Sequence, residues 1–256
     1  MLTDFVKYAL KAKNQHTLHS PFLFEFYLTC IKSKDLPFDN SEIKKLRKEL
    51  LNDKREIRIN DLGAGSKYGN KSHKSIRSIA KTAKKSEKWA SILARIVAKY
   101  EYSTSFELGT SLGLSSLMLA KANPYGKVYT FEGCSETLNI AKECFDKLEV
   151  SNVTPLLGDI TETLSTVLNQ IYRLDFAFFD ANHQYDATMS YFRLCLAKAH
   201  ENSCFVFDDI YWSEGMKKAW EEIKGHPEVT VSLDFFQMGI VFFRKNQPKQ
   251  HFVLRA

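Results

Sequence analysis

The sequence lacks long apolar runs and has few of the residues that mark low-complexity chains. Its 256 residues include only 11 glycines and 6 prolines, which excludes collagen-like and Gly- or Pro-rich disordered composition. No apolar stretch approaches the ~18 residues of a membrane-spanning helix. The first residues also lack the order of charge, apolar run and small residues that a signal peptide shows. With 44% hydrophobic residues, the chain is expected to be a compact cytoplasmic protein with no membrane partner.

Cysteines are few and are not spaced as ligands or redox pairs. The chain has five of them, without a CxxC pair or a zinc-like spacing. This pattern predicts reduced thiols, as in cytoplasmic proteins, and excludes a disulfide framework.

The positive charge is concentrated in one segment. The formal net charge is +6, but residues 67–88 hold eight Lys or Arg and one acid, Glu87, and so carry +7. The rest of the chain therefore sums to −1, which argues against a general coat for nucleic acid. Two interpretations stay open for this segment: a solvated surface, or a rim that attracts anions beside a binding site.

The chain changes character near residue 100. Helical periodicity dominates before it, over 5–13, 20–32, 41–54 and 86–100. Afterwards short apolar runs alternate with helical stretches. The strand candidates are 103–109, 127–133, 152–158, 174–180 and 203–209.

This alternation predicts an α/β fold with a doubly wound, mostly parallel sheet. Two further strands, 229–236 and 239–245, follow each other with a short turn between them, so an antiparallel hairpin should bring the sheet to seven strands. We expect an N-terminal helical extension over residues 1–100 and the α/β domain over 101–256.

The first predicted strand runs into a glycine turn. Glu107 is followed by Gly109, Ser111, Gly113 and Ser115 before a helix begins. Glycines let the backbone turn tightly and approach a ligand, and the helix start presents unpaired N–H groups. In open parallel sheets, ligands bind at the carboxyl ends of the strands, so this turn is a candidate cofactor site.

Acidic residues end the next two strands. Glu132 lies 25 residues after Glu107, where an acid commonly holds the hydroxyls of a ribose. Asp159 follows Gly158 and could accept a hydrogen bond from an adenine amine. The same Gly-Asp pair is equally typical of a simple turn.

Three carboxylates and an imidazole follow the fourth and fifth strands. They are Asp180, His183, Asp208 and Asp209. Carboxylates placed close together repel one another unless a cation lies among them. Oxygen ligands of this kind predict Mg²⁺ or another hard divalent cation.

These motifs together resemble a known enzyme family. Residues 103–245 resemble class I S-adenosylmethionine-dependent methyltransferases, and more narrowly the small-molecule O-methyltransferases related to catechol O-methyltransferase. The resemblance rests on ELGTSLGLSS, on FEG, on DDIYWSEG and on the closing hairpin.

The resemblance implies roles for the site residues. S-adenosylmethionine would be held by the glycine turn, with Glu132 on its ribose and Asp159 on its adenine. The residues implied to bind the cofactor are Glu107, Gly109, Ser111, Gly113, Ser115, Glu132, Asp159 and Asp180. Asp180, Asp208 and Asp209 would hold the metal. His183 stands where the family has a lysine base, and Asp209 stands where it has an asparagine.

The expected function is therefore methyl transfer to an oxygen, or less readily a nitrogen, of a small molecule. Two alternatives remain: a methyltransferase acting on a nucleic acid or phosphorylated substrate, with residues 67–88 as its electrostatic contact, and a non-catalytic protein that binds an adenosine ligand. A homodimer is also considered. A second glycine-rich stretch, Asp61 to Ser66, is set aside as the cofactor loop because a basic helical segment, and not a second strand ending in an acid, follows it.

Overall fold

The computed structural model describes residues 2–14, 17–59, 73–82 and 87–256. The chain forms two compact units. The central unit is Asp35–Thr166, and the terminal unit combines Met1–Lys34 with Val167–Ala256. The predicted domain boundary near residue 100 stays a prediction.

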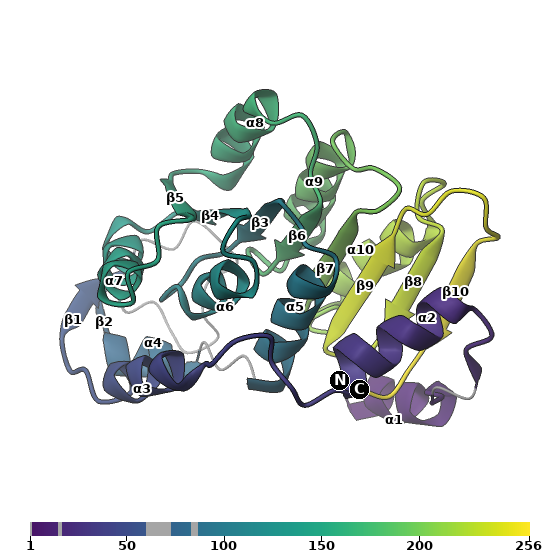
Figure 1. Ribbon diagram of the computed structural model, residues 1–256, viewed down its shortest axis with the longest axis horizontal. Coiled ribbons are helices and arrows are strands. Elements are labelled where there is room, and N and C mark those ends of the chain that lie inside the picture. Colours follow the sequence, from purple (N-terminus) through teal and green to yellow (C-terminus); the bar gives the residue numbers. More distant parts are fainter. Residues whose placement is uncertain (1, 15–16, 60–72, 83–86) are drawn as a thin grey trace. The chain divides into compact units, whose positions relative to one another are not determined.

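Three parallel strands form the sheet of the central unit, in the order β3–β4–β5 (Figure 1). They are β3 (Thr104–Leu108), β4 (Lys127–Glu132) and β5 (Val153–Leu157). Phe106 and Phe131 are fully buried on neighbouring strands, with ring centroids 5.4 Å apart. Parallel strands carry apolar residues on both faces of their sheet, and helices cover these faces because the residues must be kept from water.

One helix precedes the first strand of this sheet and one follows each strand, as the sequence predicts. They are α5 (Glu87–Lys99), α6 (Leu114–Ala122), α7 (Ser135–Lys147) and α8 (Ile160–Gln170), the last of which runs across the boundary between the units. α6 has Leu117 and Leu119 buried completely, which suits a helix enclosed on several sides.

The rest of the central unit is a smaller group of elements. It consists of α3 (Ser41–Leu50), β1 (Glu56–Arg58), β2 (His73–Ser75) and α4 (Ile76–Thr82). β1 and β2 form a separate antiparallel pair. The short strand β2 was not predicted, because its three residues, His-Lys-Ser, have no strand-like alternation.

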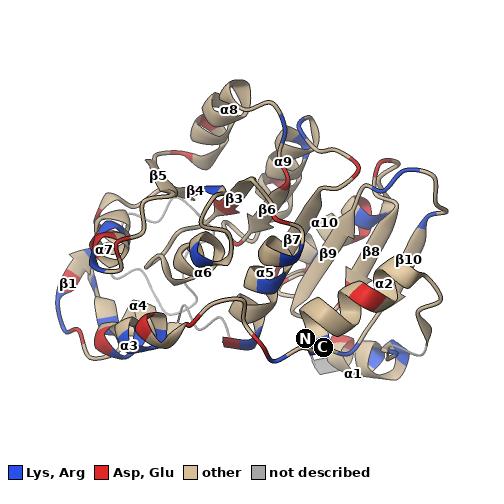
Figure 2. Ribbon diagram, viewed as in Figure 1, with Lys and Arg blue, Asp and Glu red and all other residues tan. Residues whose placement is uncertain are grey.

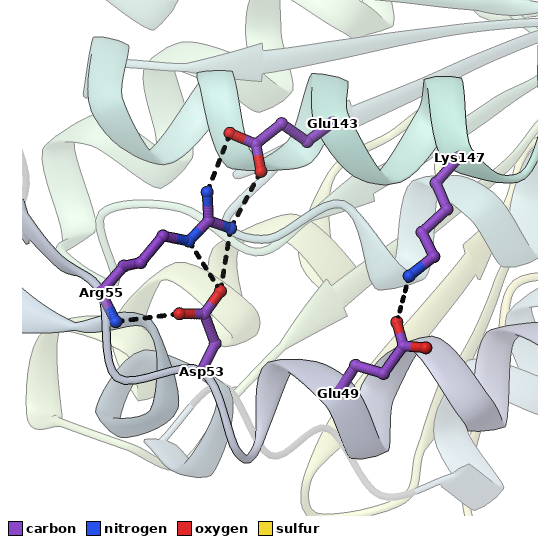
Figure 3. A network of polar contacts seen from close by, with 5 residues as sticks. All are labelled: Glu49, Asp53, Arg55, Glu143 and Lys147. Carbon is purple, nitrogen blue, oxygen red and sulfur yellow. Dashed lines mark hydrogen bonds and ion pairs between the residues drawn. The ribbon is translucent and has the colours of Figure 1, made fainter.

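Polar contacts attach this group to α7 (Figure 3). Arg55 donates to Glu143 at 2.9 Å and to Asp53 at 2.9 Å. Lys147 pairs with Glu49 of α3. Exposed pairs of this kind contribute little individually, but an arginine shared by two carboxylates orients the segment before β1.

The terminal unit has five strands in the order β10–β8–β9–β7–β6 (Figure 1). They are β6 (Phe176–Phe179), β7 (Cys204–Asp208), β8 (Val231–Asp234), β9 (Met238–Phe242) and β10 (Gln250–Val253). β6 and β7 are parallel, whereas β9 runs antiparallel to both β7 and β8. The predicted closing hairpin is therefore confirmed. β10, which pairs in parallel with β8, is an eighth strand beyond the seven expected.

Helices from both ends of the chain surround this second group of strands. They are α1 (Leu2–Lys11), α2 (Pro21–Phe26), the π-helical turn η2 (Tyr27–Lys32), α9 (Tyr185–Leu196) and α10 (Glu214–Gly225). Two tyrosines join the first residues of the chain to the last ones. Tyr8 donates to the carbonyl of Leu254 at 2.5 Å, and Tyr27 donates to that of Arg255 at 2.5 Å.

The five cysteines, all among the described residues, are buried, and none of them forms a disulfide. Burial raises the pKa of Cys144 to about 12. None of the helices described has the length and apolar character needed to cross a membrane.

Candidate functional site

The turn between β3 and α6 has the conformation that its glycines predict. Gly109 has φ of 104°, Ser111 of 48° and Gly113 of 77°, so three of five consecutive residues lie in the left-handed region. A Cβ on Gly113 would lie 2.6 Å from Cε1 of Phe145. Gly113 is thus required both by backbone conformation and by space, and α6 begins directly after it.

Glu107 lies beneath this turn. Its side chain is fully buried, and its carboxylate accepts hydrogen bonds from Ser116 and from Thr130, the latter at 2.7 Å. The hydroxyls of Thr130 and Thr110 are 2.6 Å apart. Glu107 therefore supports the turn from within the unit, and its role in cofactor binding stays a prediction.

Glu132 joins the end of β4 to the glycine turn. Its Oε2 accepts the backbone N–H of Ser111 at 2.9 Å, and its Oε1 accepts that of Cys134 at 3.0 Å. The side chain is half-buried. The structure thus brings together Ser111 and Glu132, two predicted cofactor residues from neighbouring strand ends.

Asp159 stands at the third strand end. The N–H of Gly158 donates to the carbonyl of Glu132 at 3.0 Å, which brings the ends of β4 and β5 together. Asp159 is exposed, and its Oδ1 accepts the N–H of Thr161 at 2.8 Å in the first turn of α8. Asp159 therefore stabilises a turn, which is one of the two interpretations that its sequence allowed. Its exposure also leaves it accessible to a ligand.

In the terminal unit, Asp180 directly follows β6, and Asp208 is the last residue of the neighbouring parallel strand β7. Phe179 pairs with Phe207 in the register of β6 and β7, so the two aspartates end adjacent strands. His183 reaches back toward the first of them, with Nε2 3.9 Å from Asp180 Oδ1 and with both side chains about a quarter exposed. His183 and Asp180 are the two residues expected from the sequence to be catalytic.

Asp209 has a separate backbone role. Its φ of 52° is left-handed, its N–H donates to the carbonyl of Gln237 at 2.7 Å, and its carbonyl accepts the N–H of Trp212 at 2.8 Å. Within the part of the chain that the structure describes, no three His, Cys, Asp or Glu side chains are grouped to hold a metal ion. Asp180, Asp208 and Asp209 are all described, and their role as metal ligands stays a prediction from the sequence.

A buried acid that sequence reasoning missed holds the loop after β7. Asp234 is 1% exposed. It accepts hydrogen bonds from Tyr211 Oη at 2.7 Å, from Trp220 Nε1 at 3.3 Å and from the N–H of Phe236 at 2.8 Å. Burial, followed by this carboxylate, raises the pKa of Tyr211. The sequence could have indicated Asp234, because it is an acid within the apolar run 229–236 and a buried acid needs hydrogen-bond partners.

Some predicted features lie outside the described residues. The glycine-rich stretch Asp61 to Ser66 is among them, as are Lys67, Lys71, Lys84 and Lys85 of the basic segment. Of the described cations of that segment, Lys74 is half-buried, whereas the others are exposed; these are Arg77, Lys81 and Lys88. Their expected contact with an anionic ligand stays a prediction.

Comparisons with known proteins concern the domain and its fold. Residues 106–210 match a family model described as a methyltransferase domain. The search of curated proteins finds no significant match.

Solved structures share the fold at low sequence identity. The O-methyltransferase TomG of Streptomyces achromogenes, involved in tomaymycin synthesis and solved with S-adenosylmethionine, is 20% identical with a TM-score of 0.55, over 62% of this chain and 81% of that one. An O-methyltransferase of Bacillus cereus, solved with S-adenosylhomocysteine, is 19% identical with a TM-score of 0.55, over 65% and 88%. A methyltransferase of Podospora anserina bound to S-adenosylhomocysteine is 15% identical with a TM-score of 0.56, over 83% and 100%.

The family match, together with a glycine turn and an acid at neighbouring strand ends, identifies the chain as carrying an S-adenosylmethionine-dependent methyltransferase domain with O-methyltransferases among its structural neighbours.

Proposed function

We propose that this enzyme transfers the methyl group of S-adenosylmethionine to an oxygen, or less readily a nitrogen, of a small molecule. The observation that carries the proposal is the junction of the three strand ends in the central unit. There Glu132 accepts the Ser111 N–H, while its carbonyl accepts the N–H of Gly158. This edge suits a ligand that has three different parts. The acid suits a diol, the glycine turn suits an amino acid part, and the exposed Asp159 suits a base.

The residues of that edge fit the cofactor. The turn from Gly109 to Gly113 and Ser115 would hold the methionine part, Glu132 the ribose hydroxyls and Asp159 the adenine amine. When bound, S-adenosylmethionine supplies an electrophilic methyl group on a sulfonium sulfur. What the protein adds is alignment of the acceptor, exclusion of water and removal of the acceptor's proton.

His183 is the proposed base. The reference pKa of an imidazole, ~6.5, suits proton removal at neutral pH. Asp180 lies 3.9 Å from its Nε2, and a nearby carboxylate favours the charged imidazole that results. Asp180 would thus stabilise His183 after it accepts the proton from the acceptor hydroxyl.

Mg²⁺ binding stays a prediction from the sequence and is not part of this proposal. A site made of Asp180, Asp208 and Asp209 would acidify the hydroxyl of an acceptor. Because these three side chains are not grouped in the described arrangement, no step above depends on a metal.

The proposal is tested by methyl transfer from S-adenosylmethionine labelled in its methyl group to a panel of small hydroxylated and aminated acceptors. We expect label in at least one hydroxylated acceptor, and a loss of about 100-fold or more in His183→Ala without loss of cofactor binding. His200, which pairs with Asp175 at 2.8 Å, provides a control: His200→Gln should keep the activity.

Three outcomes would count against the proposal. Label that enters only nucleic acid or phosphorylated compounds, at a rate that falls steeply with salt, would favour the electrostatic alternative. Cofactor binding without transfer to any acceptor class would favour a non-catalytic protein. Full activity of His183→Ala would remove His183 as the base.

A further inference from the structure

The helix α1 contacts its own unit through polar groups. Asp4 pairs with Lys217 of α10, with Oδ2 and Nζ 3.3 Å apart. Tyr8, one turn further on, donates to the carbonyl of Leu254. Residues four apart lie on one side of a helix, so this side of α1 faces the body of the terminal unit.

Another side of α1 presents apolar side chains to solvent. Phe5 is 48% exposed, Val6 50% and Leu10 83%. Val6 and Leu10 are four apart and share one side of the helix. Phe5 precedes Val6 by one residue and lies further around the helix, so the three form a broad apolar strip. Phe5 also contacts Phe236 edge to face, with ring centroids 5.2 Å apart, which fixes the strip on the unit. A single exposed leucine is ordinary, but three large apolar groups on a ten-residue helix are not.

Positive charge lies beside this strip. Lys7, Lys11 and Lys13 are exposed, and so is Arg255, whose backbone N–H donates to the carbonyl of Lys13 at 3.0 Å. Figure 2 shows Lys and Arg in blue on α1. The one acid of α1, Asp4, is paired with Lys217.

We propose that this surface, defined as Phe5, Val6 and Leu10 with Lys7, Lys11, Lys13 and Arg255, docks on an anionic lipid bilayer. Apolar side chains next to lysines are the composition of helices that lie in the membrane interface. Each lysine or arginine near an anionic surface adds attraction that salt screens. The contact is peripheral, and it revises the expectation of no membrane partner.

A second copy of the chain fits this surface less well. A stable interface uses about 20–30 residues on each side and buries ~800 Å² per partner. The α1 surface offers seven residues, four of them cations that would face the same cations across a two-fold axis. An anionic bilayer requires no interface of that size and does not repel these cations.

Flotation with lipid vesicles tests the proposal. The full chain is mixed with vesicles of phosphatidylcholine alone, or with about 30% phosphatidylserine added. We expect flotation with the anionic vesicles, at least tenfold weaker partitioning onto phosphatidylcholine, and release by high salt. Lys11→Ala should reduce partitioning about fivefold, and Leu10→Glu by tenfold or more because it also removes apolar burial.

Tyr172→Glu is the matched control. Tyr172 is 93% exposed in the same unit but lies outside the α1 surface, so this variant should float like the wild type. Unchanged thermal midpoints would show that each variant is folded.

The proposal is overturned if the wild-type chain does not float with anionic vesicles. It is overturned equally if Leu10→Glu floats with them as well as Tyr172→Glu does. It is also overturned if light scattering finds a dimer that Leu10→Glu dissociates while the wild type binds no vesicles. That result would assign the strip to a second copy.

Discussion

Glu132 and Ser111 are joined by a hydrogen bond of 2.9 Å from the Ser111 N–H to the carboxylate Oε2. The bond connects the acid at the end of one strand to the glycine turn after its neighbour, 21 residues earlier in the chain. Because Oε1 is held in turn by the N–H of Cys134, the carboxylate is oriented before any ligand arrives. A group ordered in advance loses less conformational freedom on binding.

Replacing Gly113 by alanine should destabilise the protein and weaken cofactor binding. The new Cβ would lie 2.6 Å from the ring of Phe145, and φ of 77° is strained for alanine. We expect a loss of about 1–3 kcal/mol in the free energy of unfolding, measured by urea denaturation.

Gly225→Ala is the control for that experiment. Gly225 ends α10, and a Cβ added to it would meet no atom within 4 Å apart from its chain neighbours and the backbone of its own helix. Alanine there should therefore be neutral or stabilise by up to about 1 kcal/mol. Wild-type stability in Gly113→Ala would contradict the described turn.

The central unit should lose part of its stability in acid through Asp53. Hydrogen bonds from Arg55 hold the pKa of the Asp53 carboxyl below its ordinary value. A lowered folded pKa stabilises the protein above the unfolded pKa, and this contribution disappears as pH falls through the folded pKa. Asp53→Asn should therefore cost about 0.5–1 kcal/mol near pH 7. The difference from wild type should shrink below about pH 4, as denaturation curves across this range would reveal; an equal difference at all pH values would argue against the ion pair.

Addition of Mg²⁺ should leave the thermal midpoint of the metal-stripped protein unchanged. The described carboxylates of Asp180, Asp208 and Asp209 do not form a three-ligand group, so a cation gains little from them. Differential scanning fluorimetry against Mg²⁺ measures this directly. A saturable rise that Asp208→Ala abolishes would instead support the metal site predicted from sequence.

Most strands of the two units could be predicted because each apolar strand is short and bounded by turn residues. β3 and β4 lie within the predicted segments 103–109 and 127–133. The glycine turn was also predictable, since Gly113 has no substitute at its φ. β10 was missed because Gln250–Val253 is a half-apolar edge segment whose pairing with β8 depends on tertiary context.

Side-chain placement was less predictable. The sequence identifies α1 as amphipathic, but periodicity does not say which side faces the protein, and Asp4 and Tyr8 decide it through contacts with residues more than 200 positions away. The hydrogen bonds of Asp234 to Tyr211 and Trp220 likewise join β8 to the loop after β7 and to α10. The left-handed backbone at Asp209 is also a local conformation that residue spacing alone does not reveal.

The most direct test of the cofactor site is calorimetric titration of S-adenosylmethionine into the wild type, Glu132→Ala and Glu162→Ala. Glu162 is an exposed acid of α8 and serves as the control. The account predicts that the wild type and Glu162→Ala bind equally, while Glu132→Ala loses about 1.5–3 kcal/mol, or roughly 10- to 150-fold in affinity. Unchanged affinity in a folded Glu132→Ala variant, or no binding by the wild type, would contradict it.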